Sequence, residues 1–204
     1  FRSVFGVGSG VLMAVKKDRL LDHVLGTFST VALSVPGFWI AIVLIFIFAE
    51  QWKILPSSGI SDGSGFILPA ITLALPSIGV CARLTRSAIL DEIGRQYMTV
   101  ADAKGMSRRR AVIRHAFGNA LIPIITYLGN HMAGIIGGAS IVETIFAIPG
   151  IGSYAIAGVQ SKDYYVVQAY VLFSGCIYVL TNILIDLIYI ALDPKIRAGE
   201  AVES

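Results

Sequence analysis

Long charge-poor stretches constrain the fold of this sequence more than any other feature. A helix crosses the hydrocarbon core of a bilayer in about 20 residues, and four such stretches approach or exceed that length: residues 24–49, 66–82, 116–142, which contains only His131 as a possible charge, and 166–192, which contains only Asp186. A shorter uncharged run, residues 4–15, precedes them. Continuous apolar runs of this length favour helices, which satisfy their own backbone hydrogen bonds in hydrocarbon. We therefore expect an all-α, polytopic transmembrane bundle of about five spans in a single domain, residues 1–204.

The composition supports a membrane protein. Of the 204 residues, 55% are hydrophobic and 14% are charged, whereas soluble domains carry about 25% charged residues. The first run does not resemble a secretory signal, because Lys16 and Lys17 follow it rather than precede it. Since the sequence begins with Phe1 rather than Met, we expect a fragment that starts partway through a helix. Cys81 and Cys176 fall within expected spans, so we expect no structural disulfide.

The basic residues indicate the orientation of the chain, because cytoplasmic connections of membrane proteins are enriched in Lys and Arg. Thirteen of the sixteen Lys and Arg residues fall in the first connection, the third connection or the tail. The second and fourth connections hold only Lys53 and Lys162. The first and third connections and the C-terminus are therefore expected to be cytoplasmic. The fourth connection, residues 143–165, is then an external loop, in which we expect a short helix at the membrane surface.

Prolines and small residues interrupt the expected spans. Pro36, Pro76 and Pro123 each remove an internal hydrogen bond from a helix, so we expect kinks at these positions. Two GxxxG patterns predict places where helices approach one another closely, namely Gly6 with Gly10 and Gly134 with Gly138.

The third connection, residues 83–115, is basic but has the pattern of a folded element. Four apolar residues recur at the spacing of an amphipathic helix: Ile89, Ile93, Tyr97 and Val100. Gly105 follows where that helix would end, and Ser107 is suited to cap a second helix that continues into the next span. We therefore expect an ordered helical hairpin on the cytoplasmic side, on which a partner docks.

The sequence lacks the motifs of common catalytic and metal sites. It has no phosphate-binding GxxxxGK(S/T) loop, no HExxH motif and no paired Cys spacing. No nucleophile and base are arranged together in the sequence. We therefore expect no enzyme activity, no catalytic residue, no metal site, no cofactor in this chain and no nucleic-acid partner.

The basic hairpin also carries a family resemblance. The stretch TVADAKGMSRRRAVIRHAFGNALIP, residues 99–123, resembles the EAA loop of ATP-binding-cassette importer permeases. Thr99, Val100 and Ala101 occupy the Glu-Ala-Ala positions and Gly105 the glycine, so the first two positions depart from the general pattern. ADAKGMS followed by RHAFGNALIP is similar to the variant found in peptide and nickel importers. Because the glutamate is missing, we expect Asp102 to make its contacts.

Other stretches resemble the first, or B-type, permease subunit of that subfamily. GGASIVETIFAIPGIGSYAIAGVQSKDYYVVQ, residues 137–168, is similar to its external segment, and NILIDLIYIALDPKIR, residues 182–197, to its closing helix. LSVPGFWIAIVLIFIFA and ILPSSG match its earlier helix and loop. The resemblance covers nearly the whole sequence. We expect that the family's first helix and the large external region after it are missing from this sequence.

In such importers the loop seats in a groove of a separate ATP-hydrolysing subunit. The resemblance implies that residues 83–115 form this EAA-type coupling loop, with small residues that allow close approach and basic residues that pair with acidic groups. The residues expected to contact the ATPase subunit are Ala101, Asp102, Ala103, Lys104, Gly105, Ser107, Arg108 and Arg109. The arginine run also has a simpler interpretation, as positive charge beside a span.

Three ionisable residues are weaker candidates for the substrate pathway or its gate. Asp186 is unfavourable in hydrocarbon unless it faces protein or water, and the alternative is a bond to a neighbouring helix near the inner surface. His131 lies in mid-span, where hydrogen bonding between helices is the alternative. The resemblance places Glu143 near the gate and the docked binding protein, and the alternative is a solvated helix end.

The resemblance implies the permease subunit of an ATP-driven importer of dipeptides, oligopeptides or nickel chelates in the inner cell membrane. The expected partners are a second permease subunit, two ATP-binding subunits that hold ATP and Mg, and an external solute-binding protein. An ion-coupled secondary transporter or a channel is an alternative, but it would need more ionisable groups within the spans. A structural membrane scaffold is a further alternative, and it would not need an ordered basic hairpin.

Overall fold

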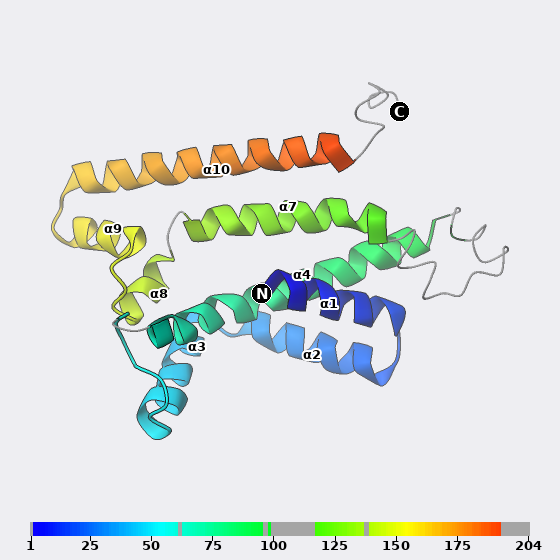
Figure 1. Ribbon diagram of the computed structural model, residues 1–204, viewed down its shortest axis with the longest axis horizontal. Helices are drawn as coiled ribbons and strands as arrows, with labels where there is room; N and C mark the ends of the chain where they lie inside the picture. Colours follow the sequence, from blue (N-terminus) through cyan, green and yellow to red (C-terminus); the bar gives the residue numbers. More distant parts are fainter. Residues whose placement is uncertain (1, 61–62, 96–97, 99–116, 137–138, 193–204) are drawn as a thin grey trace. The chain divides into compact units, whose positions relative to one another are not determined.

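The computed structural model describes residues 2–60, 63–95, 98, 117–136 and 139–192 (Figure 1). Within these ranges the chain is helical and contains no strand, which confirms the predicted all-α class. The chain divides into two compact units. The first comprises Phe1–Ile124 and Ile141–Pro149, and the second comprises Ile125–Ser140 and Gly150–Ser204.

The central helix of the first unit is α4 (Ile67–Ile93). Two helices, α1 (Arg2–Val15) and α2 (Leu20–Ser34), are joined by a short turn and pack along α4 (Figure 1). Near the two ends of α4, the side chains of Leu68 and Ile89 are almost fully buried. The burial of Ile89 shows that α4 keeps packing against its neighbours well beyond the uncharged stretch that ends at residue 82.

The first GxxxG pattern is a place of close helix approach, as predicted. A Cβ atom added at Gly10 of α1 would lie 2.5 Å from the Thr85 Cβ and 2.6 Å from the Ala82 carbonyl oxygen, both in α4. Gly6, one turn earlier, meets α4 in the same way. At Gly134, in the second pattern, no atom of the described chain lies within 4 Å of an added Cβ.

The longest uncharged stretch folds as two helices rather than one straight span. The first is α2, and the second is α3 (Gly37–Leu44), which continues as a π-helix over Ile45–Gln51. The two parts meet at an angle of 99°. Val35 is extended (ψ 124°), as a residue before a proline prefers, and Pro36 has no N–H to continue α2. The kink predicted at Pro36 is therefore a break.

Two helical segments are long and apolar enough to cross a membrane, namely Gly63–Ile93 and Tyr164–Ile188. The bent pair α2–α3 is a third if its two parts form one span. The sequence predicts about five spans, whereas the described residues contain two helices, or three with the bent pair, that meet the length and composition of a span. Pro76 and Pro123 lie inside continuous helices, the first in α4 and the second in α7 (Phe117–Ile136).

The second unit contains α9 (Ile151–Gln160) and α10 (Tyr164–Leu192), and the six-residue α8 (Ser140–Ile145) begins at its boundary. The short helix predicted within residues 143–165 therefore exists as α9. Along α10 most large apolar side chains are exposed, and Leu172 reaches 70% of its maximal exposure. A helix that is apolar on all faces requires a cover of lipid or protein.

Candidate functional site

The residues expected to contact the ATPase subunit lie outside the described ranges. They are Ala101, Asp102, Ala103, Lys104, Gly105, Ser107, Arg108 and Arg109, and they belong to residues 99–116, which we call the coupling segment. The structure does describe the helices on both sides of this segment, α4 before it and α7 after it. The described part of the candidate site therefore consists of the helices next to the coupling segment and the residues that contact them.

The two helices that flank the coupling segment are joined at its base. The Asn119 side-chain nitrogen in α7 donates a hydrogen bond of 3.1 Å to a carboxylate oxygen of Glu92 in α4. The other carboxylate oxygen of Glu92 lies 3.0 Å from Arg95 Nε. The last turn of α4 and the first turn of α7 are thus held close together.

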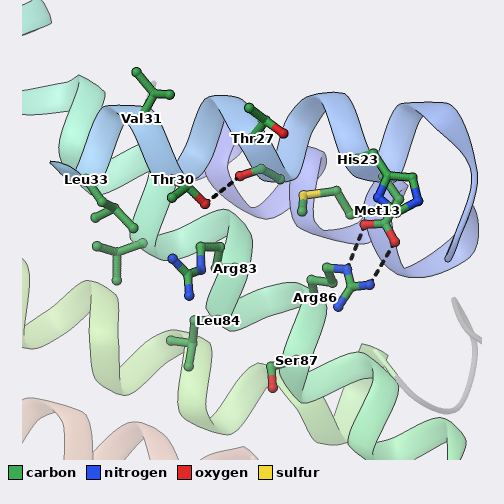
Figure 2. Close-up of a pocket in the computed structure, with 13 residues that line it drawn as sticks. Met13, His23, Thr27, Thr30, Val31, Leu33, Arg83, Leu84, Arg86 and Ser87 are labelled. Carbon is green, nitrogen blue, oxygen red and sulfur yellow. Dashed lines mark hydrogen bonds and ion pairs between the residues drawn. The ribbon is translucent and has the colours of Figure 1, made fainter. Parts of the chain in front are cut away.

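A buried ion pair joins α2 to α4 (Figure 2). The Arg86 guanidinium donates from Nε and Nη2 to the two carboxylate oxygens of Asp22, and both distances are 2.7 Å. The Asp22 side chain is only 5% exposed, whereas that of Arg86 is 29% exposed. This two-pronged geometry is the strongest form of the arginine–carboxylate contact, because it fixes orientation as well as distance.

The turn between α1 and α2 also supports the Asp22 carboxylate. The backbone N–H of Asp18 donates to Asp22 Oδ2 at 3.0 Å. Asp18 adopts φ +63°, a left-handed conformation that Asp tolerates better than most residues. Asp22 lies in the first turn of α2, where a negative charge is favoured by the helix dipole. The carboxylate thus connects the basic first connection to the part of α4 that leads into the coupling segment.

An open groove of about 950 Å³ runs between α2 and α4 (Figure 2). Its polar lining includes His23, Thr27 and Thr30 from α2 and Arg83, Arg86 and Ser87 from α4. On α2 these residues are three or four positions apart, and on α4 Arg86 and Ser87 lie three and four positions after Arg83, so each set shares one face. The α2–α4 groove therefore has a polar stripe on both walls, within helices that are otherwise mostly apolar.

The charge pattern of the sequence places Arg83 and Arg86 in a cytoplasmic connection and does not indicate a role for Asp22. The structure places both arginines inside α4, which extends to Ile93. The signal available in the sequence was a carboxylate at the start of one apolar helix and two arginines at the end of another. Asp22 and Arg86 are 64 positions apart in the sequence, and their pairing depends on how the two helices pack.

The three weaker candidates for a pathway or gate lie in different surroundings. His131 in α7 stacks on Tyr127 with ring centroids 5.6 Å apart, and it belongs to the second unit. Asp186 lies on α10, also in the second unit, and is exposed. Glu143 lies in α8 within the first unit and is half-buried, and its carbonyl oxygen accepts a hydrogen bond from Ile148 at 2.8 Å.

The second and fourth connections touch each other in the first unit. The backbone N–H of Gly59 donates to the Phe146 carbonyl oxygen at 2.8 Å, and the Phe146 side chain is 1% exposed. These two connections therefore lie at one end of the unit. The basic first connection contacts α4 near Arg86, through Asp22. The contact between basic connections is therefore separate from the contact between the second and fourth connections, which are poor in basic residues.

One family model and several curated proteins match this chain over most of its length. Residues 6–198 match the family described as "Binding-protein-dependent transport system inner membrane component". The "Probable peptide ABC transporter permease protein y4tP" of Sinorhizobium fredii is 40% identical over 200 residues, which cover 94% of this chain and 64% of that protein.

Two further relatives come from Escherichia coli. The "Dipeptide transport system permease protein DppB" is 35% identical over 228 residues, covering 97% of this chain and 67% of that protein. The "Glutathione transport system permease protein GsiC" is 34% identical over 194 residues, covering 95% of this chain and 63% of that protein. The chain thus spans about two thirds of the length of the curated relatives it matches.

Proposed function

The chain belongs to the family of binding-protein-dependent transport system inner membrane components, and on this basis we propose that it is a permease subunit of an ATP-driven importer of small peptides. The observation that carries the proposal is the similarity over nearly the whole chain to proteins named as peptide, dipeptide and glutathione permeases. These names favour peptide cargo over nickel chelates, the other cargo that the resemblance of the sequence implied.

The proposed assembly contains a second permease subunit, two ATP-binding subunits that hold ATP and Mg, and an external solute-binding protein. It lies in the inner cell membrane, with the coupling segment and the C-terminus on the cytoplasmic side. The distribution of basic residues supports this orientation. The contact between Gly59 and Phe146 supports it as well, because it groups the two connections that the charge pattern assigns to the outside.

In the proposed mechanism, the ATPase subunits move the coupling segment, and the motion enters this chain through the end of α4. The Asp22–Arg86 pair carries it to α2, and the close contact at Gly10 carries it to α1. The three helices then move as one block relative to α3, because the chain is broken at Pro36. This movement alternately opens the cargo path to the two sides of the membrane.

The proposal is tested with the whole importer, purified with its partner subunits and reconstituted in proteoliposomes. We expect ATPase activity that the binding protein stimulates, and uptake of dialanine that requires ATP. Uptake that proceeds without ATP and follows an imposed ion gradient would contradict the proposal and favour the secondary transporter. ATPase activity that does not respond to the binding protein would contradict the proposed partner set.

A further inference from the structure

The α2–α4 groove contains two arginines in different electrostatic surroundings (Figure 2). Arg86 is paired with the Asp22 carboxylate through two hydrogen bonds of 2.7 Å. Arg83, three residues earlier on α4, is exposed and forms no ion pair or hydrogen bond with any residue that the structure describes. Within the described ranges, no carboxylate therefore compensates the charge of Arg83.

Hydroxyl groups line the opposite wall of the groove. Thr27 and Thr30 are both exposed on α2 and, with Arg83, belong to the groove lining (Figure 2). The Thr30 hydroxyl donates to the Gly26 carbonyl oxygen at 2.9 Å. The Thr27 hydroxyl makes no hydrogen bond within the described chain, so its proton is free for a ligand. A guanidinium suits a carboxylate, whose two oxygens accept from its N–H groups, and the hydroxyl on the other wall is a further donor within the groove.

A charge at this depth of α4 requires contact with water or protein. The segment Gly63–Ile93 has 31 residues and is therefore roughly 46 Å long, whereas the hydrocarbon core is about 30 Å thick. Arg83 precedes the end of the helix by ten residues, or roughly 15 Å. It thus lies near the edge of the hydrocarbon core, where a long arginine side chain reaches water at the membrane surface or in an aqueous path.

We infer that Arg83 binds the carboxylate of the cargo as the cargo passes the α2–α4 groove. This inference rests on the proposed function and adds a contact that recognises cargo within the membrane domain. Every unmodified peptide carries a C-terminal carboxylate whatever its side chains are. A single cation placed in this way therefore accepts peptides of many sequences, and the Asp22–Arg86 pair leaves Arg83 as the positive charge that the cargo meets.

The test compares two cargos and two substitutions in the reconstituted whole importer. Uptake of dialanine is measured beside uptake of dialanine amide, which lacks the carboxylate. For Arg83→Gln we expect dialanine uptake to fall about tenfold relative to uptake of the amide. Arg83→Lys keeps the charge and should retain most of the preference for dialanine. Any selectivity of the binding protein is the same in every variant, so it cancels when the cargo ratios are compared.

Three results would overturn the inference. Equal loss of uptake for both cargos in Arg83→Gln would mean that Arg83 pairs with an acidic group of a partner subunit. Unchanged uptake of both cargos would mean that Arg83 only contributes to membrane topology. If the unsubstituted importer shows no ATP-dependent uptake of dialanine, the proposed function itself fails, and this outcome is distinct from the other two.

Discussion

At the scale of single residues, Asp22 shows how a charge is held inside a largely apolar protein. A carboxylate removed from water is strongly unfavourable unless charges and hydrogen-bond donors replace the water. Asp22 accepts two hydrogen bonds from Arg86 and one from the Asp18 backbone. Because the two arginine bonds fix both direction and distance, the pair sets the rotation of α2 about its axis relative to α4.

Replacing Asp22 by Asn should destabilise the permease, because the amide leaves Arg86 without a counter-charge in a partly buried position. We expect a loss of about 2 kcal/mol, measured as a lower midpoint of thermal unfolding in detergent. Asp18→Asn is the matched control, since it also removes one negative charge from this turn and Asn tolerates the left-handed conformation. Equal stability of the two variants would contradict a structural role for the ion pair.

The Asp22–Arg86 pair could not be predicted from the sequence. Arg83, Arg86 and the other basic residues all fit the general enrichment of positive charge on the cytoplasmic side. That rule gives the side of the membrane but not the partner of any one residue. The difference between Arg83 and Arg86 arises only when α2 packs against α4, because one arginine then meets a carboxylate and the other faces a groove.

At the scale of helices, the contact between α1 and α4 depends on glycine. The backbone of α1 lies so close to α4 at Gly10 that an added Cβ would overlap Thr85 and the Ala82 carbonyl. Close contact of this kind is how helices associate where no hydrophobic effect drives them together. The proposed joint movement of α1 and α4 therefore requires that this surface stay free of side chains.

Gly10→Ala should weaken the packing of α1 on α4 by about 1–3 kcal/mol, the range for overpacking a close contact. Gly8→Ala is the control on the same helix, because no described atom lies within 4 Å of a Cβ at that position. Thermal unfolding in detergent measures both variants. We expect a lower midpoint for Gly10→Ala only, and similar midpoints would show that α1 does not depend on this contact.

The positions of the helices were easier to predict from the sequence than their bends. The uncharged runs identified the regions of α1 to α4, α7 and α10, because apolar length alone favours helix in hydrocarbon. At Pro36 one helix ends and the next begins at an angle of 99° to it, whereas Pro76 and Pro123 lie inside continuous helices. The glycine that follows Pro36 lowers helix propensity further. Whether a proline bends or breaks a helix also depends on the neighbours that replace its lost hydrogen bond.

At the scale of the whole molecule, the proposed orientation places the first and third connections on the cytoplasmic side and the second and fourth on the other side of the membrane. Cysteine labelling in vesicles tests this assignment, with Cys81 and Cys176 replaced by Ser. A membrane-impermeant thiol reagent should label Lys162→Cys from the periplasmic side and Lys17→Cys only from the cytoplasmic side. Both lysines are exposed in the structure, so access is limited by the membrane. Labelling of both from the same side would contradict the proposed orientation.

The central claim is that a separate ATPase subunit drives this permease through the coupling segment. Replacing Gly105 by Leu should disturb that contact, and Gly118→Leu is the control, because no described atom lies within 4 Å of a Cβ there. The measurement is the amount of dialanine imported per ATP hydrolysed in proteoliposomes that contain the whole importer. For Gly105→Leu we predict continued hydrolysis with at least a tenfold loss of import per ATP, and for Gly118→Leu a normal ratio. A normal import ratio in Gly105→Leu would contradict the claim.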